Sequence, residues 1–301
     1  MTKAPAADLP TDFLVLTAQP GSHVLSDDRL AALAEAIPTL PTHQRLGDAA
    51  VQYAIDKDLL GIADAMRDRF ADEPFDINRV SDTSRQKRML IADLESTIIE
   101  QECLDELAKE IGKEDVIADI TQRAMRGELD FEPALKERVA MLRGLPEAAL
   151  QQLYDTGISL MPGAATLLAT LRKHDVFCGL VSGGFAFFAA RIADKLNFNR
   201  YQCNDLNVTD EVLDGTVVEP ILGRAAKAEI LTAWATEMGL TAEDVLAVGD
   251  GSNDLAMLGI AGMGVAFRAK PAVAESARYR ITHGDLTALL YLQGYQQKDF
   301  A

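Results

Sequence analysis

The stretch MLIADLEST at residues 89–97 is a short apolar strand that ends in acidic and hydroxyl-bearing residues. Further apolar runs bounded by glycine or acidic residues lie at 176–182, 245–250 and 263–267. Helical patterns separate these runs, at 163–173, 185–196, 225–238 and 252–260. Short apolar strands that alternate with helices favour a parallel sheet covered on both faces. We therefore predict an α/β fold with a doubly wound, Rossmann-like parallel sheet.

The region before residue 89 has a different pattern. We predict strands at 12–17, 42–47, 50–55 and 75–80, with helices at 27–37 and 58–70. The order βαββαβ predicts a small ferredoxin-like α+β unit, and the polar stretch 81–88 predicts a linker. We expect this N-terminal domain over 1–84 and the α/β core over 85–301. A hairpin at 206–217, which contains Asp214-Gly215, would be appended to the core.

Composition limits the classes of partner. The chain has 301 residues, 48% hydrophobic, and a formal net charge of −17, which disfavours a nucleic-acid partner. It has no apolar run of about eighteen residues and no secretory signal pattern, so we expect no membrane partner. Three scattered cysteines, Cys103, Cys178 and Cys203, fit reduced thiols better than a disulfide framework, and we expect a cytoplasmic protein.

Three of the predicted strand ends carry polar or glycine-rich residues, and ligands of such folds bind at the carboxyl ends of strands. DLEST (93–97) places Asp93 where a carboxylate held against a metal can attack phosphorus. On its own, such an aspartate is more commonly a helix cap or turn residue. In VSGGF (181–185), two glycines and a helix N-terminus would suit an anion, or would simply form a tight turn capped by Ser182.

The segment VGDGSNDLAM (248–257) has two carboxylates, Asp250 and Asp254, on a glycine-rich turn. Oxygen ligands of this kind suit Mg²⁺, which favours a metal site over a capped turn. Lys227, in a helical run, would be an ordinary solvated charge by itself. Together with the other segments, it could neutralise a phosphoryl group during transfer.

In this order, the four segments resemble the haloacid dehalogenase superfamily of phosphotransferases and, within it, the phosphoserine phosphatases. The resemblance covers roughly residues 88–290. It includes ECLDELA (102–108), RAMRGELDFEPALKERV (123–139), LMPGA (160–164) and AFRAKPAV (266–273). The N-terminal region resembles only loosely an amino-acid-binding, ACT-like regulatory module.

The resemblance implies a role for each matching residue. Asp93 would be the nucleophile, and Glu95 the general acid and then the general base. Mg²⁺ would be held by Asp93, the main-chain carbonyl of Glu95 and Asp250. The phosphoryl oxygens would be bound by Ser182, Lys227 and the backbone of Gly183, with Asn253 and Asp254 supporting substrate and metal.

The resemblance also implies a helical cap inserted at about 100–157. Glu102 would meet the ammonium of the substrate and Arg138 its carboxylate, with Met125 and Phe131 lining the pocket. An amino acid zwitterion needs one anion and one guanidinium fork to bind it, so these residue types suit the task.

The implied activity is Mg²⁺-dependent hydrolysis of O-phospho-L-serine through an aspartyl-phosphate, the last step of serine biosynthesis. One residue departs from the family pattern, because Glu95 occupies a position where aspartate is usual, which puts the rate and the phosphoryl acceptor in question. Transfer to an alcohol such as homoserine is one alternative, and a regulatory binding protein with impaired catalysis is another.

The sequence does not show what the N-terminal domain does. It could bind serine, mediate a homodimer, or do neither. Because every implied catalytic residue lies after the linker, we expect a fragment without residues 1–84 to stay folded and active.

Overall fold

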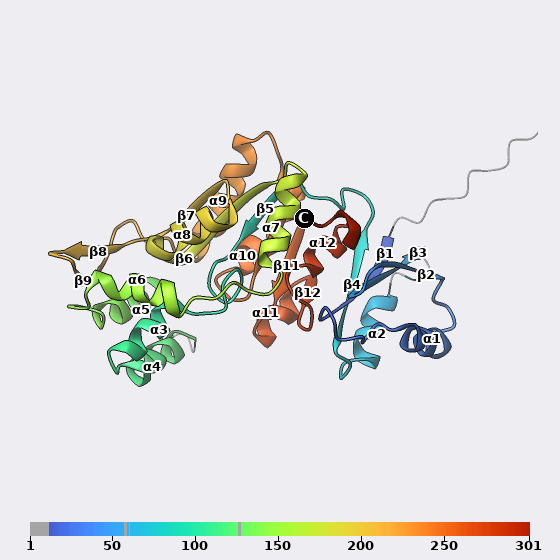
Figure 1. Ribbon diagram of the computed structural model, residues 1–301, viewed down its shortest axis with the longest axis horizontal. Coiled ribbons are helices and arrows are strands. Elements are labelled where there is room, and N and C mark those ends of the chain that lie inside the picture. The colour runs from blue at the N-terminus through green and yellow to red at the C-terminus, as the bar shows by residue number, and fades with distance from the viewer. Residues whose placement is uncertain (1–11, 57–58, 60, 126–127) are drawn as a thin grey trace, which may run out of the picture. The chain divides into compact units, whose positions relative to one another are not determined.

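The computed structural model describes residues 12–56, 59, 61–125 and 128–301. The chain forms two compact units (Figure 1). One contains the residues up to Gln86 together with Tyr279–Ala301, and the other is Lys87–Arg278. The boundary that we predicted at 84 and 85 lies two residues before the observed one. The C-terminal segment, which we assigned to the core, belongs to the first unit.

The first unit has an antiparallel sheet of order β2-β3-β1-β4. Its elements are β1 (Asp12–Ala18), α1 (Asp27–Ala36), β2 (His43–Gly47), β3 (Ala50–Ile55), α2 (Ile62–Arg69) and β4 (Phe75–Ser81). Alternate residues of β1, such as Leu14 and Leu16, lie on one face and pack with Leu33 of α1 and Met66 of α2. The predicted ferredoxin-like unit is therefore confirmed.

The C-terminal segment covers this sheet as well. It contains β12 (Tyr279–Ile281), α12 (Ala288–Leu292) and the short helix η3 (Gln297–Asp299). β12 contacts β4, α12 contacts β1, and every residue of α12 is buried. A fragment without residues 1–84 would lose the contacts of α12 with β1; that such a fragment stays folded and active stays a prediction.

Two polar side chains of β4 bind the same segment. The carboxylate of Asp76 accepts hydrogen bonds from the backbone N–H groups of Thr282 (2.7 Å), His283 (3.1 Å) and Gly284 (2.9 Å). Asn78 both donates to and accepts from the backbone of Arg280, at 2.8 and 3.0 Å. These side chains fix a loop that lies some two hundred positions away in the sequence.

The predicted linker is also packed. Arg85 is buried and donates hydrogen bonds to the carbonyl oxygens of Tyr291 and Leu292 and to the side chain of Gln52. Its guanidinium lies 4.7 Å from the ring centroid of Phe13. Burial lowers the pKa of Arg85 to about 10. One of the polar residues of 81–88, Arg85, is therefore a buried structural residue and not part of an exposed linker.

The second unit contains the predicted parallel sheet. Its strands lie in the order β11-β10-β5-β6-β7, each parallel to its neighbours. They are β5 (Met89–Ala92), β6 (Phe177–Phe185), β7 (Arg200–Asn204), β10 (Val245–Gly249) and β11 (Met263–Phe267). The chain moves from β5 to β6 on one side and later returns to β10 on the other. The carboxyl ends of β5 and its neighbours therefore meet at a topological switch point, where ligands bind in such folds.

Helices flank this sheet. They are α7 (Ala164–Lys173), α8 (Ala186–Leu196), α9 (Arg224–Glu237), η2 (Ala242–Asp244), α10 (Leu255–Ile260) and α11 (Pro271–Ser276). Met89 and Ile91 of β5 pack with Leu231 and Trp234 of α9 and with Met257 of α10. All residues of β5, β10 and β11 are buried, as expected for strands covered on both faces.

A helical cap interrupts the chain between β5 and α7. It consists of α3 (Cys103–Glu110), α4 (Glu114–Met125), α5 (Phe131–Ala140) and α6 (Glu147–Thr156). Ile99 and Leu160 form an antiparallel bridge, and the N–H of Met161 donates to the carbonyl of Ile98 at 2.9 Å. The two segments that connect cap and core therefore run side by side.

Two local predictions need correction. The hairpin of β8 (Leu206–Thr209) and β9 (Val212–Val217) turns at Asp210-Glu211, where both residues have positive φ, and not at Asp214-Gly215. Gly215 lies inside β9, where a Cβ atom would be 2.9 Å from Cβ of Arg143. Strand β7 was not predicted, because its largely exposed edge position leaves it without an apolar run.

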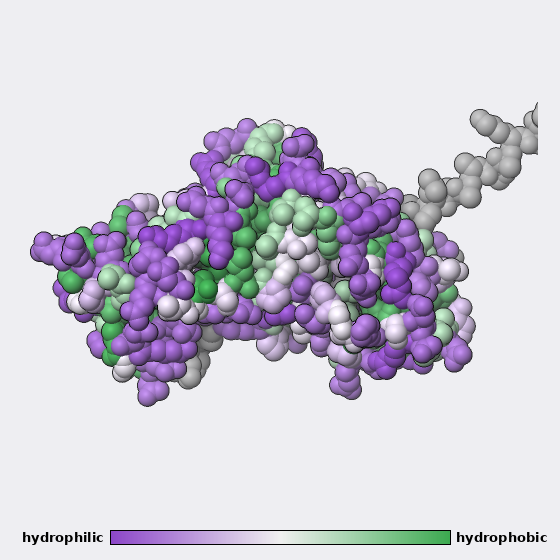
Figure 2. Space-filling model, viewed as in Figure 1, coloured by the Kyte–Doolittle hydropathy of each residue, from purple (hydrophilic) through white to green (hydrophobic). Residues whose placement is uncertain are grey.

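Hydrophilic residues predominate on the face of the molecule shown in Figure 2, with apolar residues between them. Among the described residues, no helix is both long enough and apolar enough to cross a membrane.

We predict that Asp76→Ala destabilises the first unit. It would leave backbone N–H groups of the loop at 282–284 without their acceptor, at a cost of roughly 1–3 kcal/mol. Thermal and denaturant unfolding would measure the loss. Asp72→Ala is the matched control, because Asp72 is exposed on the loop before β4. Equal unfolding free energies for the two variants would contradict the structural role of Asp76.

Candidate active site

A pocket of about 240 Å³ opens between the carboxyl ends of the parallel strands and the helical cap. The predicted site residues that line it come from the ends of β5, β6 and β10 and from the cap. They are Asp93, Glu95, Glu102, Phe131, Arg138, Ser182, Gly183, Asp250 and Asn253. Segments up to about 180 positions apart in the sequence therefore meet in one pocket.

Acidic side chains and one buried lysine form the base of the site. Asp93 follows β5, and Lys227 reaches it from α9 with its Nζ 2.9 Å from Asp93 Oδ1. The same ammonium lies 2.6 Å from Oδ1 of Asp254. Lys227, Asp93 and Asp254 are all buried, with exposed fractions of 1, 5 and 0%. The helical run around Lys227 thus supplies a structural and electrostatic partner rather than a solvated charge.

The carboxylates of this cluster repel one another. Burial, followed by the charge of Asp254, raises the pKa of Asp93 to about 7 even though Lys227 opposes the shift. Burial and the charge of Asp93 likewise raise the pKa of Asp250 to about 7. For Lys227, burial alone would lower the pKa, but the two carboxylates outweigh it and raise the pKa. One ammonium therefore does not neutralise the cluster.

The donor set fits a metal ion. Oxygen atoms of Asp93, Asp250 and Asp254 lie within 4.8 Å of one another. Both oxygens of Asp254 already accept hydrogen bonds, from Lys227 Nζ and from the N–H of Gly251. Asp250 accepts none among the described residues, so its oxygens are available. Buried, mutually repelling carboxylates bind a divalent cation readily, because the cation removes the repulsion.

The end of β6 forms the second side of the pocket. Ser182 Oγ accepts a hydrogen bond from the N–H of Gly184 at 3.0 Å, which leaves the hydroxyl hydrogen able to donate. The carbonyl of Gly183 accepts from Nδ2 of Asn204 at 2.9 Å, and Asn204 also accepts from the N–H of Leu222. These hydrogen bonds of Asn204 hold the backbone of Gly183 in place. Strand β6 continues to Phe185, and α8 begins at the next residue.

Glu95 connects the core to the cap. Its Oε1 accepts a hydrogen bond from the N–H of Cys103, the first residue of α3, at 2.9 Å. Burial, followed by the charge of Glu102, raises the pKa of Glu95 to about 8. Glu95 therefore holds a proton near neutral pH, as a general acid must.

The cap places further predicted residues over the pocket. Glu102 occupies the N-cap position of α3 without a side-chain capping hydrogen bond, and accepts a hydrogen bond at 2.8 Å from Oγ of Ser96, a residue with positive φ. Arg138 lies on α5, with its Nε 3.3 Å from the carbonyl oxygen of Ala134, and forms no ion pair with another described residue. Phe131 lies next to Gly183, where a Cβ atom would be 3.2 Å from the ring.

One predicted residue cannot be placed in the same way. Met125 is the last residue of α4, but its side chain lies outside what the structure describes.

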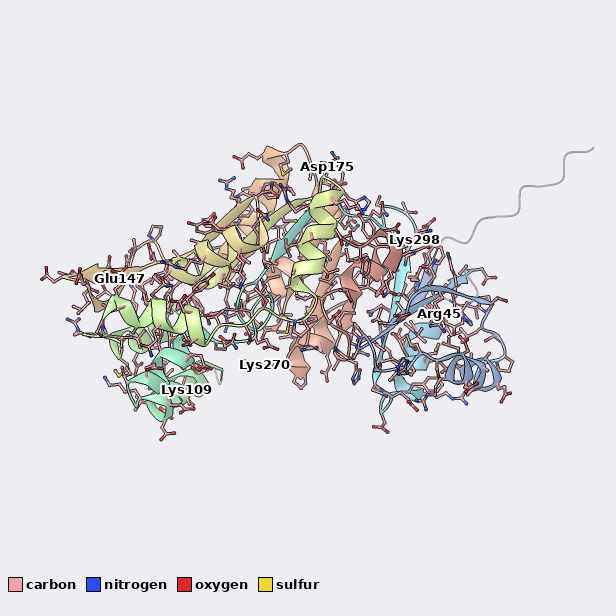
Figure 3. The ribbon with its side chains drawn as sticks, in the orientation of Figure 1. Arg45, Lys109, Glu147, Asp175, Lys270 and Lys298 are labelled. Carbon is pink, nitrogen blue, oxygen red and sulfur yellow. The ribbon has the colours of Figure 1, made fainter. Side chains whose placement is uncertain are left out.

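The sequence did not point us to several other residues that line the pocket. They are Leu104, Asp105, Thr121, Leu135, Arg224 and Lys270, whereas Gly184, Phe185, Gly251 and Ser252 lie in the strand-end motifs VSGGF and VGDGSNDLAM described above. Asp105 lies three positions after Glu102, a spacing that places residues on one helix face. Lys270, labelled in Figure 3, follows the end of β11. Applying the strand-end rule to this fourth strand would have identified it.

The sequence of this chain is similar to those of known hydrolases. The model of the haloacid dehalogenase-like hydrolase family matches residues 90–259. A phosphoserine phosphatase of Mycobacterium tuberculosis is 42% identical over 210 residues, which cover 70% of this chain and 51% of that protein. One from Streptococcus thermophilus is 42% identical over 203 residues, 67% of this chain and 94% of that protein. The chain spans about half the length of some of its relatives and nearly all of others.

Solved structures agree with these matches. A HAD-family hydrolase from Salmonella enterica serovar Typhi has a TM-score of 0.84 and 27% identity, and the match covers 93% of this chain and 98% of that one. A phosphoserine phosphatase solved as a phospho-aspartyl intermediate analogue has a TM-score of 0.64 and 36% identity over 68% of this chain and 98% of that one. The family model spans more than half of the sequence, and the fold and pocket geometry agree with it, so this chain belongs to the haloacid dehalogenase-like hydrolases.

Proposed function

We propose that this chain is a phosphoserine phosphatase, which hydrolyses O-phospho-L-serine to L-serine and phosphate through an aspartyl-phosphate. One observation carries the proposal. Asp93, held by the buried ammonium of Lys227, lies in the same pocket as Glu95 and below the cap residues Glu102 and Arg138. Relatives about 40% identical carry the name phosphoserine phosphatase, which supports the same substrate.

The cap supplies groups that suit a zwitterionic amino acid. Glu102 offers a carboxylate to the ammonium of the substrate, and Ser96 fixes one of its oxygens. Arg138 offers a guanidinium to the carboxylate of the substrate, because it is not committed to another described carboxylate. The ring of Phe131 lies against Gly183 at the end of β6. The phosphate would then lie toward Ser182, the backbone of Gly183 and Lys227.

The first chemical step assigns the nucleophile and the acid. An oxygen of Asp93 attacks phosphorus, and the bond between phosphorus and the serine oxygen breaks. Glu95 gives its proton to the leaving serine oxygen. We assign this proton to Oε2, because Oε1 is occupied by the N–H of Cys103. Lys227 and Ser182 hold the phosphoryl oxygens during the transfer.

The second step reverses the proton transfer. Glu95, now ionised, takes a proton from a water molecule that attacks phosphorus, and the bond between phosphorus and Asp93 breaks. Phosphate leaves and Glu95 is again protonated. We propose Mg²⁺ as the resident ion, held by Asp93, the carbonyl of Glu95 and Asp250, where it would supply charge neutralisation and orient the phosphoryl group. Asp254 and Asn253 would support this arrangement.

The proposed reaction is the last step of serine biosynthesis, and we propose that it takes place in the cytoplasm. An alcohol could replace water in the second step, which would make the chain a phosphotransferase. Including homoserine as a competing acceptor in the assays below distinguishes the two, because a hydrolase releases all of the phosphate whatever alcohol is added.

We predict that the protein releases phosphate from phosphoserine faster than from phosphothreonine, phosphotyrosine or sugar phosphates, and only with a divalent cation. Phosphate release from this panel, with Mg²⁺ and with a chelator, is the measurement. The reason for the metal requirement is the uncompensated charge of Asp93, Asp250 and Asp254. Full activity with chelator would contradict the metal assignment, and no release from phosphoserine under any condition would contradict the proposed function.

We predict that Arg138→Ala raises KM for phosphoserine far more than KM for an aryl phosphate that lacks a carboxylate. Loss of a buried guanidinium–carboxylate contact costs roughly 2–5 kcal/mol, which corresponds to about 30-fold or more in kcat/KM. Lys136→Ala on the same helix is the control, because Lys136 is half exposed and pairs with Glu219 outside the pocket. Equal losses on both substrates would mean that Arg138 has only a structural role.

We predict that Glu95→Gln lowers kcat for phosphoserine by at least about 10²-fold, the usual effect of losing a general acid. The amide keeps the size of the side chain but cannot deliver the proton. An aryl phosphate has a better leaving group, so its phosphorylation of Asp93 should be less affected. Titration with Mg²⁺ should show unchanged metal affinity, since only the backbone of Glu95 is assigned to the metal. A wild-type rate for Glu95→Gln on phosphoserine would exclude Glu95 as the acid.

A further inference from the structure

The carboxyl of Glu95, the proposed general acid, is one methylene longer than the aspartate that the resemblance leads us to expect at this position. The structure shows where the longer side chain goes. Its carboxyl lies between two segments that are distant in sequence, the start of α3 in the cap and the end of β6 in the core. On the cap side, Oε1 accepts the N–H of Cys103 at 2.9 Å.

On the core side, the carboxyl of Glu95 lies against Gly184. A Cβ atom at position 184 would be 2.7 Å from Oε2, 2.9 Å from Cδ and 3.1 Å from Oε1 of Glu95. These are the three nearest atoms, and all belong to the one carboxyl group. The two shorter distances are closer than a Cβ atom comes to a non-bonded atom, so a side chain at 184 would displace the carboxyl or be displaced by it.

The backbone gives no other reason for a glycine at this position. The φ angle of Gly184 lies outside the left-handed region, in contrast to Gly163 at +83°. The N–H of Gly184 donates to Ser182 Oγ, and an alanine would keep that donor. The preceding glycine has a different neighbour, since a Cβ at Gly183 would meet the ring of Phe131.

We propose that Gly184 is a positioning residue for the general acid. By having no side chain, it leaves the space in which Oε2 of Glu95 lies, opposite the hydrogen bond from Cys103. This inference rests on the proposed function only for its catalytic consequence. The contact between position 184 and the carboxyl is a property of the fold.

The consequence of filling this space follows from the same contacts. A methyl group at 184 pushes the carboxyl of Glu95 away from β6, and Oε1 then loses the geometry of its hydrogen bond to Cys103. Glu95 is partly buried and lines the pocket, so the displaced carboxyl would move into the pocket and away from the position that its hydrogen bond fixes. An aspartate at position 95 would withdraw the carboxyl by about 1.5 Å, one carbon–carbon bond, and would leave room for the methyl group. The two substitutions should therefore compensate.

The test is a double-mutant cycle with wild type, Gly184→Ala, Glu95→Asp and the double variant. We expect Gly184→Ala to lower kcat for phosphoserine by about 10²-fold with a smaller change in KM, as for a misplaced general acid. The loss on an aryl phosphate should be smaller. In the Glu95→Asp background, Gly184→Ala should lower kcat by less than about threefold. Gly259→Ala is the control, because no atom lies within 4 Å of a Cβ at that position.

Thermal unfolding of the same proteins provides a readout that does not depend on the reaction. Gly184→Ala should lower the Tm by about 2–4 °C or more alone, and by clearly less in the Glu95→Asp background. Equal losses of kcat and Tm in both backgrounds would overturn the inference, because the methyl group would then act on something other than Glu95. A wild-type protein without phosphoserine hydrolysis would overturn the proposed function, while the unfolding cycle would still decide whether position 184 contacts the carboxyl.

Discussion

The buried ammonium of Lys227 is the interaction on which the site depends. It joins α9 to the end of β5 through Asp93 and to the turn after β10 through Asp254, at 2.9 and 2.6 Å. A buried charge is tolerated only when it is paired, and removing one partner leaves the others uncompensated. Without Lys227, the carboxylates would repel one another with no internal counter-charge. The same ammonium therefore holds three segments together and prepares the position at which a phosphoryl group would develop negative charge.

Core and cap divide the proposed work between them. The proposed nucleophile and metal ligands lie at strand ends of the core, and the proposed phosphate contacts lie at a strand end and on α9. Glu102 and Arg138, which would recognise the amino acid, lie on the cap. Glu95 is the link between the two, since it belongs to the core and accepts a hydrogen bond from the first residue of α3. Because Glu102 and Cys103 are adjacent at the start of α3, a shift of this helix would change the position of Glu102 and the hydrogen bond to the proposed acid together.

Much of the fold could be predicted because its signals are local. The apolar runs of β5, β10 and β11 are continuous because those strands are buried on both faces, and their polar ends mark the pocket. Elements with weaker local signals were missed or misplaced. Strand β7 is an edge strand without an apolar run, and the hairpin turn lies at Asp210-Glu211 although Asp214-Gly215 has the stronger turn signal. We assigned the C-terminal segment to the core, whereas it packs in the first unit. The hydrophobic pattern of a helix shows which of its faces is buried, but not which sheet that face covers.

The sequence by itself determined most of the strands and helices, the order of the motifs and the residue types available for chemistry, because periodicity and turn chemistry act over a few neighbouring residues. Only the tertiary structure decided which of these residues meet. It places Asp76 against a loop some two hundred positions away, Lys227 between two carboxylates, and the carboxyl of Glu95 in the space left by Gly184. Such contacts depend on how elements that are distant in the sequence pack together, to within a fraction of an ångström. No local pattern in the sequence specifies this packing.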